Sequence, residues 1–316
     1  MKQYFKFIYI ILFFALCMSD LIYGQSFVAM TIDDIPRTGK TLMENYKSKL
    51  LNVLDSLNIP ITIFVIEGLV YKGDNIDKNF ELLNNWMNRS YTTIGYHSTE
   101  HPRYSDVGLD SFMIDIAKGE YNIRELAKKH GKSVDYFRFP YNDLGKDSIE
   151  HYNIERFLSS RNFKIAPFTV ESNDWAYCYV YEYYLGKNDS AKANSVARDY
   201  ISMTLSYFDF FDSLSIKVYG KKIKHIYLCH DNVLNADYLP VLVNELKKKG
   251  YTFISFDEAL KDPLYQQKDL YYKKWGISWL YRWIENQKEI NSLQKQEPVD
   301  NMYPVYQKLF DEQKNK

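Results

Sequence analysis

Histidine and cysteine are scarce in this sequence, and neither sign of charge is in excess. The 316 residues include 6 histidines and 3 cysteines, and 40 acidic side chains balance 40 basic ones. This balance gives no electrostatic sign of nucleic acid or of an anionic membrane surface as a partner. Internal repeats, proline-rich linkers and low-complexity tracts are also missing, so we expect one large domain rather than an array of small ones.

The first 24 residues differ from the rest of the chain. Two lysines, Lys2 and Lys6, precede an apolar run over residues 7–18, and a polar break then leads to Gly24. This arrangement is typical of a secretory signal peptide, because the apolar run is short for a membrane span and a small residue offers a cleavage point. We therefore expect a secreted or periplasmic protein that loses residues 1–24 and keeps no stable membrane span.

An uncleaved N-terminal anchor is the alternative interpretation of this segment. A lipid anchor on Cys17 is disfavoured, because Leu16 stands where lipoprotein processing requires a small residue. The mature chain then keeps Cys178 and Cys229, and export permits a disulfide without requiring one. We expect two free thiols.

Short apolar segments alternate with longer amphipathic ones after this leader. Strand followed by helix, about seven times over, indicates parallel strands with helical crossovers, and therefore an α/β barrel or a doubly wound sheet. Gly131 and Gly250 stand where caps of helix C-termini are expected. The expected strands are 26–32, 61–66, 92–96, 134–139, 163–170, 225–230 and 251–256, and the expected helices are 41–57, 80–87, 110–130 and 238–250.

Two segments do not fit this alternation. Residues 178–222 form a long tyrosine-rich stretch that predicts a helical insertion, and an aromatic tail starts at about residue 263. We expect both to be helices packed on the exterior of the domain, with the last ten or so residues frayed. The predicted domain therefore covers residues 25–262, and residues 263–316 form a helical C-terminal extension.

Aromatic side chains make up 17% of the chain and recur in this tail. They include Trp275, Trp279, Tyr281 and Trp283. Stacking on sugar faces is one interpretation. Their spacing of three to four residues favours the other, the apolar stripe of a helix that docks on the domain.

Polar side chains follow five of the predicted strands at the point where each strand ends. In α/β folds the carboxyl ends of parallel strands meet at one face, and reactive groups lie on the loops there. We therefore expect these side chains to converge on one site. They are Asp33 and Asp34 after the first strand, His97 and His101 after the third, Arg138 and Tyr141 after the fourth, Asp174 and Trp175 after the fifth, and His230 after the sixth.

Two histidines and a carboxylate make a three-ligand set for a catalytic divalent ion and leave a coordination position open for water or substrate. His101 follows His97 at the spacing of one helical turn, so both rings can point at the same place. Taken alone, such a pair is a weak signal. Metalloprotease chemistry is disfavoured, because Ser98 follows the first histidine where a zinc protease has glutamate.

The adjacent carboxylates Asp33 and Asp34 repel each other at the end of an apolar strand unless a positive group lies near. A metal could hold one of them, and Arg138 could hold the other as an ionised base. The alternative is a solvated turn or a helix cap ahead of Pro36. Arg138 could also be an ordinary paired arginine, and His230 a buried core histidine. Their shared position at strand ends favours the functional interpretation.

Five segments, in this order, resemble the motifs of the polysaccharide deacetylase family, also known as the NodB homology domain or carbohydrate esterase family 4. They are T-x-D-D at Thr31–Asp34, H-[ST]-x-x-H at His97–His101, R-x-P at Arg138–Pro140, an acidic D-W segment at Asp174–Trp175, and L-x-H at Leu228–His230. Five ordered motifs are far more specific than any one of them. The resemblance implies a distorted (β/α) barrel of about seven strands.

The resemblance also implies a role for each of these residues. Asp34, His97 and His101 would bind a divalent metal, usually Zn²⁺, which activates water and polarises an acetyl group. The other implied roles are the catalytic base for Asp33, its orienting partner for Arg138, an oxyanion donor for the backbone N–H of Tyr141, the general acid for His230, and contact with the substrate for Trp175, Tyr141 and Pro140.

One position departs from the family pattern. Glu171 stands where the family commonly has aspartate, so the residue that tunes His230 is either Glu171 or Asp174, and we favour Asp174.

Together these roles imply a metal-dependent hydrolase that acts on an N- or O-acetylated polysaccharide or oligosaccharide. A hydrolase of a non-sugar amide or ester, or a non-catalytic carbohydrate-binding protein, is the alternative. Substrate choice depends on loops that vary freely, and the oligomeric state is not readable from the sequence.

Overall fold

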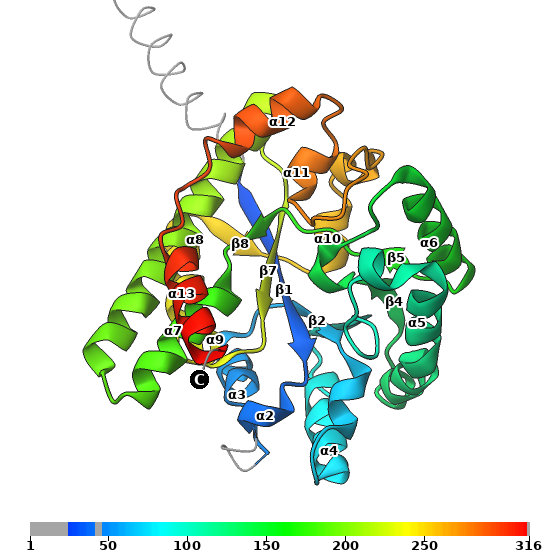
Figure 1. The fold of residues 1–316 in the computed structure, drawn as a ribbon, viewed down its shortest axis with the longest axis vertical. Helices are drawn as coiled ribbons and strands as arrows, with labels where there is room; N and C mark the ends of the chain where they lie inside the picture. The colour runs from blue at the N-terminus through cyan, green and yellow to red at the C-terminus, as the bar shows by residue number, and fades with distance from the viewer. Residues whose placement is uncertain (1–24, 42–45, 315–316) are drawn as a thin grey trace, which may run out of the picture.

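A curled β-sheet of parallel strands forms the centre of the molecule (Figure 1). The computed structural model describes residues 25–41 and 46–314. Along the sheet the strands follow the order β5-β4-β3-β2-β1-β7-β6, and β8 pairs with the first residues of β1. The strands are β1 (Ser26–Ile35), β2 (Ile61–Val65), β3 (Thr92–Tyr96), β4 (Val134–Phe137), β5 (Lys164–Ile165), β6 (Val170–Glu171), β7 (His225–His230) and β8 (Tyr251–Phe253).

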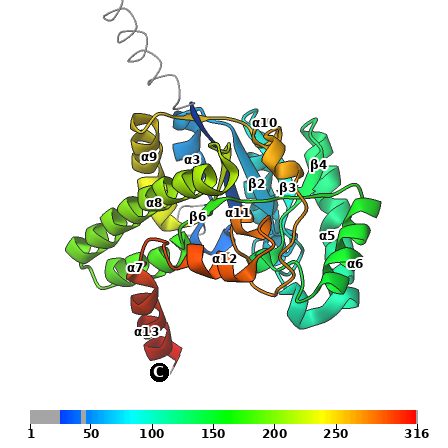
Figure 2. The ribbon, with the colours of Figure 1, turned by 90° about the horizontal axis from the view of Figure 1, so that it is seen from above.

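Helices surround this sheet, as the view from above shows (Figure 2). The central strands are therefore buried along nearly their whole length, which explains why they read as continuous apolar runs rather than as alternating patterns. The helices are α2 (Thr38–Thr41), α3 (Lys49–Leu57), α4 (Ile76–Met87), α5 (Tyr104–Lys129), α6 (Ser148–Ser160), α7 (Asp174–Gly186), α8 (Ser190–Tyr219), α9 (Val233–Lys248), α10 (Phe256–Leu260), α11 (Trp279–Arg282), α12 (Gln287–Gln294) and α13 (Met302–Lys314), with 3₁₀ turns η2 (Glu67–Tyr71), η3 (Pro140–Asn142) and η4 (Pro263–Gln266).

The predicted α/β barrel is confirmed, with one change at the fifth strand. The sequence predicts a single strand over 163–170, but the structure divides it into β5, which pairs with β4, and β6, which pairs with β7. β5 and β6 stand at opposite ends of the strand order. The chain from Ile165 to Val170 reaches roughly 18 Å at most, so the two edges of the curled sheet lie close together. Pro167 has no amide hydrogen for a ladder, which helps to interrupt the strand.

The predicted insertion is a pair of helices, α7 and α8, and α7 begins at Asp174, before the predicted start. Asp212 fastens α8 to the sheet. Its carboxylate accepts hydrogen bonds from His225 Nε2 at 3.1 Å and from the Tyr251 hydroxyl at 2.9 Å, and Lys222 Nζ lies 3.0 Å away. Burial alone would raise the pKa of Asp212, but these partners lower it to about 2.

The C-terminal extension has less helix than predicted at its start and more at its end. Only α11 is helical within the aromatic segment, so the predicted helical stripe is wrong. Trp279, Tyr281 and Trp283 are nevertheless buried, as packing residues, whereas Trp275 is 62% exposed. Where we expected frayed residues, the described part of the chain instead ends in a regular helix, α13, which continues to Lys314.

A buried arginine holds this extension on the domain. Arg282 is fully buried, and its Nη2 donates to Asp269 Oδ2 at 2.5 Å. Its guanidinium lies 4.6 Å from the centre of the Trp279 ring. The Leu270 amide donates to the Arg282 carbonyl at 2.8 Å. These contacts order a stretch of the extension that lacks regular secondary structure.

Three further expectations concern the N-terminus, the membrane and the thiols. The predicted signal peptide lies outside the described residues. Among the helices that the structure describes, none has the length and apolar character that crossing a bilayer requires. Cys178 and Cys229 are both buried and free, as expected.

We predict that Asp212→Asn reduces the pH dependence of stability in acid. A carboxylate with a depressed pKa stabilises the folded state above its unfolded value of 3.8, and this contribution disappears as the pH falls towards 2. Between pH 4 and pH 2 the free energy of unfolding should therefore fall by about 2 kcal/mol more in the wild type than in the variant. Urea denaturation at several pH values measures this difference.

The control is Asp209→Asn, which changes an exposed carboxylate on the same helix. Its free energy of unfolding should depend on pH as that of the wild type does. Identical pH dependence in the Asp212 variant and the wild type would show that these contacts contribute nothing.

Candidate active site

A bulge at the end of β1 brings two consecutive carboxylates to the same region. The register between β1 and β2 shifts between Ile32 and Ile35, so that three steps on β1 match two on β2. Asp34 absorbs the extra residue with a φ of 66°, in the left-handed region. On a regular strand Asp33 and Asp34 would point to opposite faces. With the bulge, both approach His97.

Asp34, His97 and His101 converge on one point, and their donor atoms all lie within 4.8 Å of one another. Asp34 Oδ1 is 3.6 Å from His97 Nε2 and 3.7 Å from His101 Nε2. These distances are too long for hydrogen bonds and suit a common cation between the three atoms. Asp34 Oδ1 is also buried without a hydrogen-bond partner among the described residues, an arrangement that is costly unless a ligand satisfies it. The three residues therefore fit a divalent metal.

The tautomer of His97 supports this interpretation. Its Nδ1 lies 2.7 Å from the Arg138 carbonyl oxygen. Because a carbonyl only accepts, Nδ1 must carry the hydrogen, and the Nε2 lone pair then faces Asp34. Burial lowers the pKa of His97 to about 3 and also lowers that of His101, which keeps both imidazoles in the neutral form that binds metals.

The segment between the two histidines is a tight turn and not the helical turn that their spacing suggests. Ser98 and His101 have φ values of 70° and 57°. The Ser98 hydroxyl accepts a hydrogen bond from the His101 amide at 3.0 Å. Asp115 on α5 holds the same turn, because its carboxylate accepts from the amides of Thr99 at 2.9 Å and Glu100 at 3.0 Å. The position of the second histidine thus depends on α5.

Asp33 and Arg138 form a buried pair beside this set, with Arg138 Nη1 3.8 Å from Asp33 Oδ2. Arg138 donates through Nη2 to the Thr31 hydroxyl at 3.3 Å and to the Pro167 carbonyl at 3.2 Å, and its guanidinium lies 4.5 Å from the Phe64 ring centre. Asp33 Oδ1 has no hydrogen-bond partner among the described residues. Burial raises the pKa of Asp33 to about 6, although the charge of Arg138 opposes the increase.

His230 is held by a buried carboxylate. Asp174 Oδ1 lies 2.7 Å from His230 Nδ1, and Asp174 Oδ2 accepts from the His230 amide at 2.9 Å and from the side-chain amides of Asn232 and Asn235, each at 2.7 Å. Burial alone would lower the pKa of His230, but the charge and the hydrogen bond of Asp174 raise it to about 10. These contacts favour the protonated imidazole, and its Nε2 is not engaged by Asp174.

Glu171 has different partners. Its carboxylate accepts from the Asn173 amide at 2.7 Å, and burial raises its pKa to about 7. Asp174 rather than Glu171 forms the hydrogen bond with His230, as we favoured, although the tuning role itself stays a prediction.

An open cavity of about 380 Å³ connects part of this group of side chains to solvent. Asp34, His101 and His230 line it, together with Trp175 and Tyr306. Trp175, which we expected to contact substrate, is 39% exposed. Tyr306 comes from α13, and its ring centre lies 5.0 Å from that of Trp175. The C-terminal extension therefore supplies part of the wall of this cavity.

A column of stacked side chains joins His101, the second candidate metal ligand among the histidines, to the extension. The Tyr141 ring centre is 4.7 Å from that of His101, and the Arg103 guanidinium lies 4.2 Å from the Tyr141 ring and 4.9 Å from the Trp275 ring. Gly276 continues this contact, because a Cβ there would lie only 2.7 Å from the Tyr141 carbonyl oxygen. The extension thus supports the loop whose backbone N–H is the predicted oxyanion donor.

Some outcomes differ from the expected inventory. Pro140 is buried at the start of η3, and neither Pro140 nor Tyr141 is among the residues that line the cavity. Asn232 and Asn235 were not predicted, although an asparagine directly before a helix is a cap signal, and Asn232 does cap α9. Asp115 and Tyr306 were missed as well. They lie far in sequence from the residues that they support, and no local pattern marks them.

Comparisons with known proteins point to one family. Residues 22–154 match the family model for polysaccharide deacetylase. YheN of Bacillus subtilis (strain 168), named provisionally as a polysaccharide deacetylase, is 24% identical over 238 residues, which cover 75% of this chain and 69% of YheN.

Solved structures resemble the fold at low sequence identity. A mutant of a carbohydrate esterase family 4 pseudoenzyme gives a TM-score of 0.50 at 15% identity, covering 75% of this chain and 68% of the other. The wild-type pseudoenzyme, from Bacillus anthracis, gives 0.49 at 15% identity, with 75% and 66% covered. Identities this low concern the fold alone.

We predict that Asp115→Ala weakens metal binding without removing a ligand. The turn that carries His101 loses two hydrogen bonds, and changes of this kind typically cost about tenfold or more in metal affinity. Competition with a chromophoric Zn²⁺ chelator measures the change. Asp110→Ala removes an exposed carboxylate from the same helix and should bind Zn²⁺ as the wild type does. Unchanged affinity in the Asp115 variant would contradict the supporting role.

Proposed function

We propose that this chain, whose residues 22–154 match the family model for polysaccharide deacetylase, is a metal-dependent hydrolase that removes acetyl groups from an N- or O-acetylated glycan. The observation that carries this proposal is that three candidate metal ligands, a buried carboxylate and a histidine–aspartate pair lie together. Asp34, His101 and His230 of this group line one open cavity. Asp34, His97 and His101 would hold the cation, and two imidazoles with one carboxylate suit Zn²⁺. When bound, it would supply Lewis acidity that polarises an acetyl carbonyl and acidifies water.

Asp33 has the geometry of a general base. Its Oδ2 faces Arg138 at 3.8 Å and His97 Nε2 at 3.8 Å, so the carboxylate lies directly beside the ligand set. Its Oδ1 is left without a partner and can accept a proton from an attacking water. Arg138 orients the Asp33 carboxylate, because hydrogen bonds from Arg138 Nη2 to the Thr31 hydroxyl and the Pro167 carbonyl hold the guanidinium in place.

His230 is suited to be the general acid. The hydrogen bond from Nδ1 to Asp174 fixes the ring, and Nε2 remains to deliver a proton. In the reaction the oxygen of water bonds to the acetyl carbon while Asp33 takes a proton. The bond from that carbon to the sugar nitrogen or oxygen then breaks, and His230 protonates the leaving group.

The Tyr141 backbone N–H is the proposed donor to the developing oxyanion. A left-handed conformation at Tyr141, with φ of 57°, turns this loop beside His101. Donors of this kind are worth roughly 3 kcal/mol in enzymes from which one has been removed. Trp175 would form a wall against the acetyl group, and Pro140 would act by starting the turn and not by touching the substrate.

A glycan is the proposed substrate, and we propose that the protein meets it after export, since the leader predicts a secreted or periplasmic location. A non-sugar amide or ester is a second candidate, because the catalytic groups suit either. A carbohydrate-binding protein without activity is a third, since a solved relative in fold is a pseudoenzyme. The complete set of base, ligands and acid argues against it, because binding alone needs none of them.

Acetate release from a panel of acetylated glycans and small acetyl esters tests this function. We predict that Asp33→Asn lowers kcat by at least about 100-fold, because the base is lost. The variant should still bind Zn²⁺, since Asp34, His97 and His101 are intact. Elemental analysis of the purified protein checks the metal content.

The matched variant is His101→Ala, which should lose metal and activity together. Normal acetate release by Asp33→Asn would refute the assignment of the base. A wild-type protein that binds Zn²⁺ but releases acetate from no member of the panel would refute the proposed function.

A separate prediction concerns the extension. Tyr306→Ala should raise KM for an acetylated oligosaccharide several-fold and leave hydrolysis of a small acetyl ester unchanged, because the ring lines the cavity beside Trp175 and does not touch the catalytic groups. Tyr306→Phe keeps the ring and should behave as the wild type does. Val305→Ala, on the exposed side of the same helix, controls for damage to α13. An equal loss with both substrates would contradict a role in binding the glycan.

A further inference from the structure

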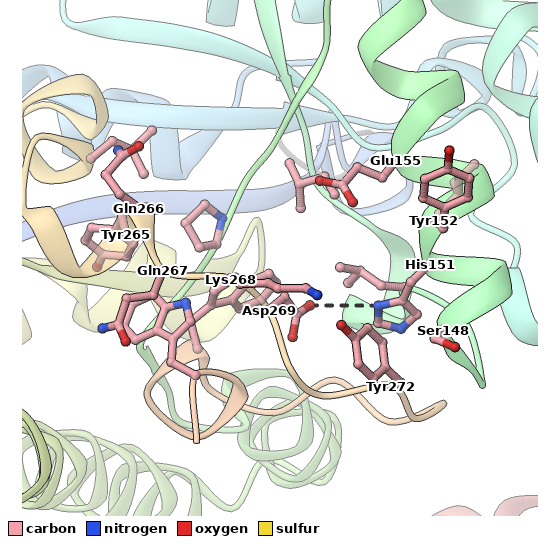
Figure 3. Close-up of a pocket in the computed structure, with 17 residues that line it drawn as sticks. Ser148, His151, Tyr152, Glu155, Tyr265, Gln266, Gln267, Lys268, Asp269 and Tyr272 are labelled. Atoms are coloured by element: carbon pink, nitrogen blue, oxygen red, sulfur yellow. Dashed lines mark ion pairs between the residues drawn. The ribbon is translucent and has the colours of Figure 1, made fainter. Parts of the chain in front are cut away.

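A second cavity lies between the domain and its extension, outside the catalytic site (Figure 3). Its volume is about 650 Å³, within the range of small-ligand pockets. One wall is α6, with His151 and Tyr152, and the facing wall is the segment after η4, with Asp269 and Tyr272. The proposed reaction uses none of these residues.

Aromatic rings form much of the lining. Trp279 and Trp283 are more than nine-tenths buried and contribute ring surface at the cavity, whereas Tyr152 is 57% exposed at its edge. The Tyr272 ring centre lies 5.2 Å from that of His151. Flat apolar faces of this kind bind ligands that have both apolar faces and polar edges.

The polar groups of the cavity are arranged for hydrogen bonding and not for charge. His151 Nε2 lies 3.1 Å from the Gly145 carbonyl, so Nε2 carries a hydrogen there and Nδ1 is an acceptor in the neutral ring. Nδ1 faces Asp269 Oδ2 at 3.9 Å, a gap wider than a hydrogen bond (Figure 3). Burial and the nearby Arg282 lower the pKa of His151, which favours this neutral form. In the neutral ring, Nδ1 is therefore left to accept from a hydroxyl group of a ligand. Asp269 Oδ2, on the other side of the gap, already accepts from Arg282 and would accept from the ligand in addition.

The net charge of the lining is small. Asp269 already pairs with Arg282 at 2.5 Å, and the exposed charges of Glu155 and Lys268 have opposite signs. The side-chain amides of Gln266 and Gln267 add donors and acceptors without charge. A phosphate or another strongly charged ligand finds no cationic cluster here. A neutral ligand rich in hydroxyl groups fits both the rings and the amides.

The cavity also adjoins the loop that carries Tyr141, the proposed oxyanion donor. Leu144 lines it and lies three residues after Tyr141. Tyr272 precedes Trp275, whose ring covers the Arg103 side chain that stacks on Tyr141. The loop after Tyr141 and the segment before Trp275 therefore both contribute to the lining of this second cavity.

We propose that this second cavity binds a neutral pyranose oligosaccharide, with Tyr152 and Tyr272 stacking on sugar faces and His151 and Asp269 accepting from hydroxyl groups. The proposal rests on the proposed function for the choice of a glycan, and the cavity could hold either a distant part of the polymer being deacetylated or a separate glycan chain.

Calorimetric titration of the full mature chain with a hexasaccharide of N-acetylglucosamine tests the proposal without requiring turnover. Tyr152→Ala and Tyr272→Ala should each weaken binding by about tenfold, the loss expected for one stacking ring. Tyr121→Ala removes a tyrosine that is 72% exposed on α5 and should bind as the wild type does. Thermal unfolding of each variant checks that the fold is intact, and Tyr152 is exposed enough for its loss to be tolerated.

The hydrolysis of the same hexasaccharide separates the two sources of the glycan. A rise in KM that parallels the loss of binding indicates the polymer being deacetylated, and an unchanged KM indicates a separate chain. Binding that is equal in the wild type, Tyr152→Ala and Tyr272→Ala overturns the proposal, as does an equal loss in Tyr121→Ala. Failure of the wild type to release acetate from every member of the panel of glycans and esters would refute the proposed function and leave the binding result standing.

Discussion

The bulge at the end of β1 is the constraint on which the candidate active site depends. Without it, Asp33 and Asp34 would point to opposite faces of the sheet, and one carboxylate could not be a base while its neighbour served as a metal ligand. Bringing two carboxylates together has a cost in repulsion and lost hydration. Arg138 offsets part of it for Asp33, and a cation would offset it for Asp34. Each aspartate still has one buried oxygen without a hydrogen-bond partner among the described residues. This is expected if Asp34 binds a cation and Asp33 accepts a proton.

The elements outside the family-model match complete the site. His230 and Asp174 lie beyond residue 154, on β7 and at the start of α7. The C-terminal extension contacts this site at two places. Tyr306 lies in the wall of the candidate catalytic cavity, and Trp275 lies at the end of the column of side chains that starts at His101. This part of the chain is therefore more than an outer layer. It lines the catalytic cavity, buttresses the Tyr141 loop and encloses a second cavity.

Sequence reasoning succeeded where a local pattern carries the physical cause. β3 and β7 begin and end where their apolar runs predict. The candidate ligands Asp34, His97 and His101 come together because parallel strands share one carboxyl edge. It failed where distant contacts override the local pattern. The apolar run 163–170 is divided between two sheet edges, and the aromatic spacing near Trp279 packs into the core without forming a long helix.

The sequence by itself determined the residue types, their order and the strands that carry them, because side-chain chemistry and hydrophobic periodicity are local properties. It therefore determined the fold class and the candidate ligands. The tertiary structure alone decided which atoms face one another: that Asp174 and not Glu171 reaches His230, that α5 holds the turn before His101 through Asp115, and that Tyr306 joins the cavity. These contacts depend on the packing of elements that are far apart in the chain, and no short stretch of sequence encodes that packing.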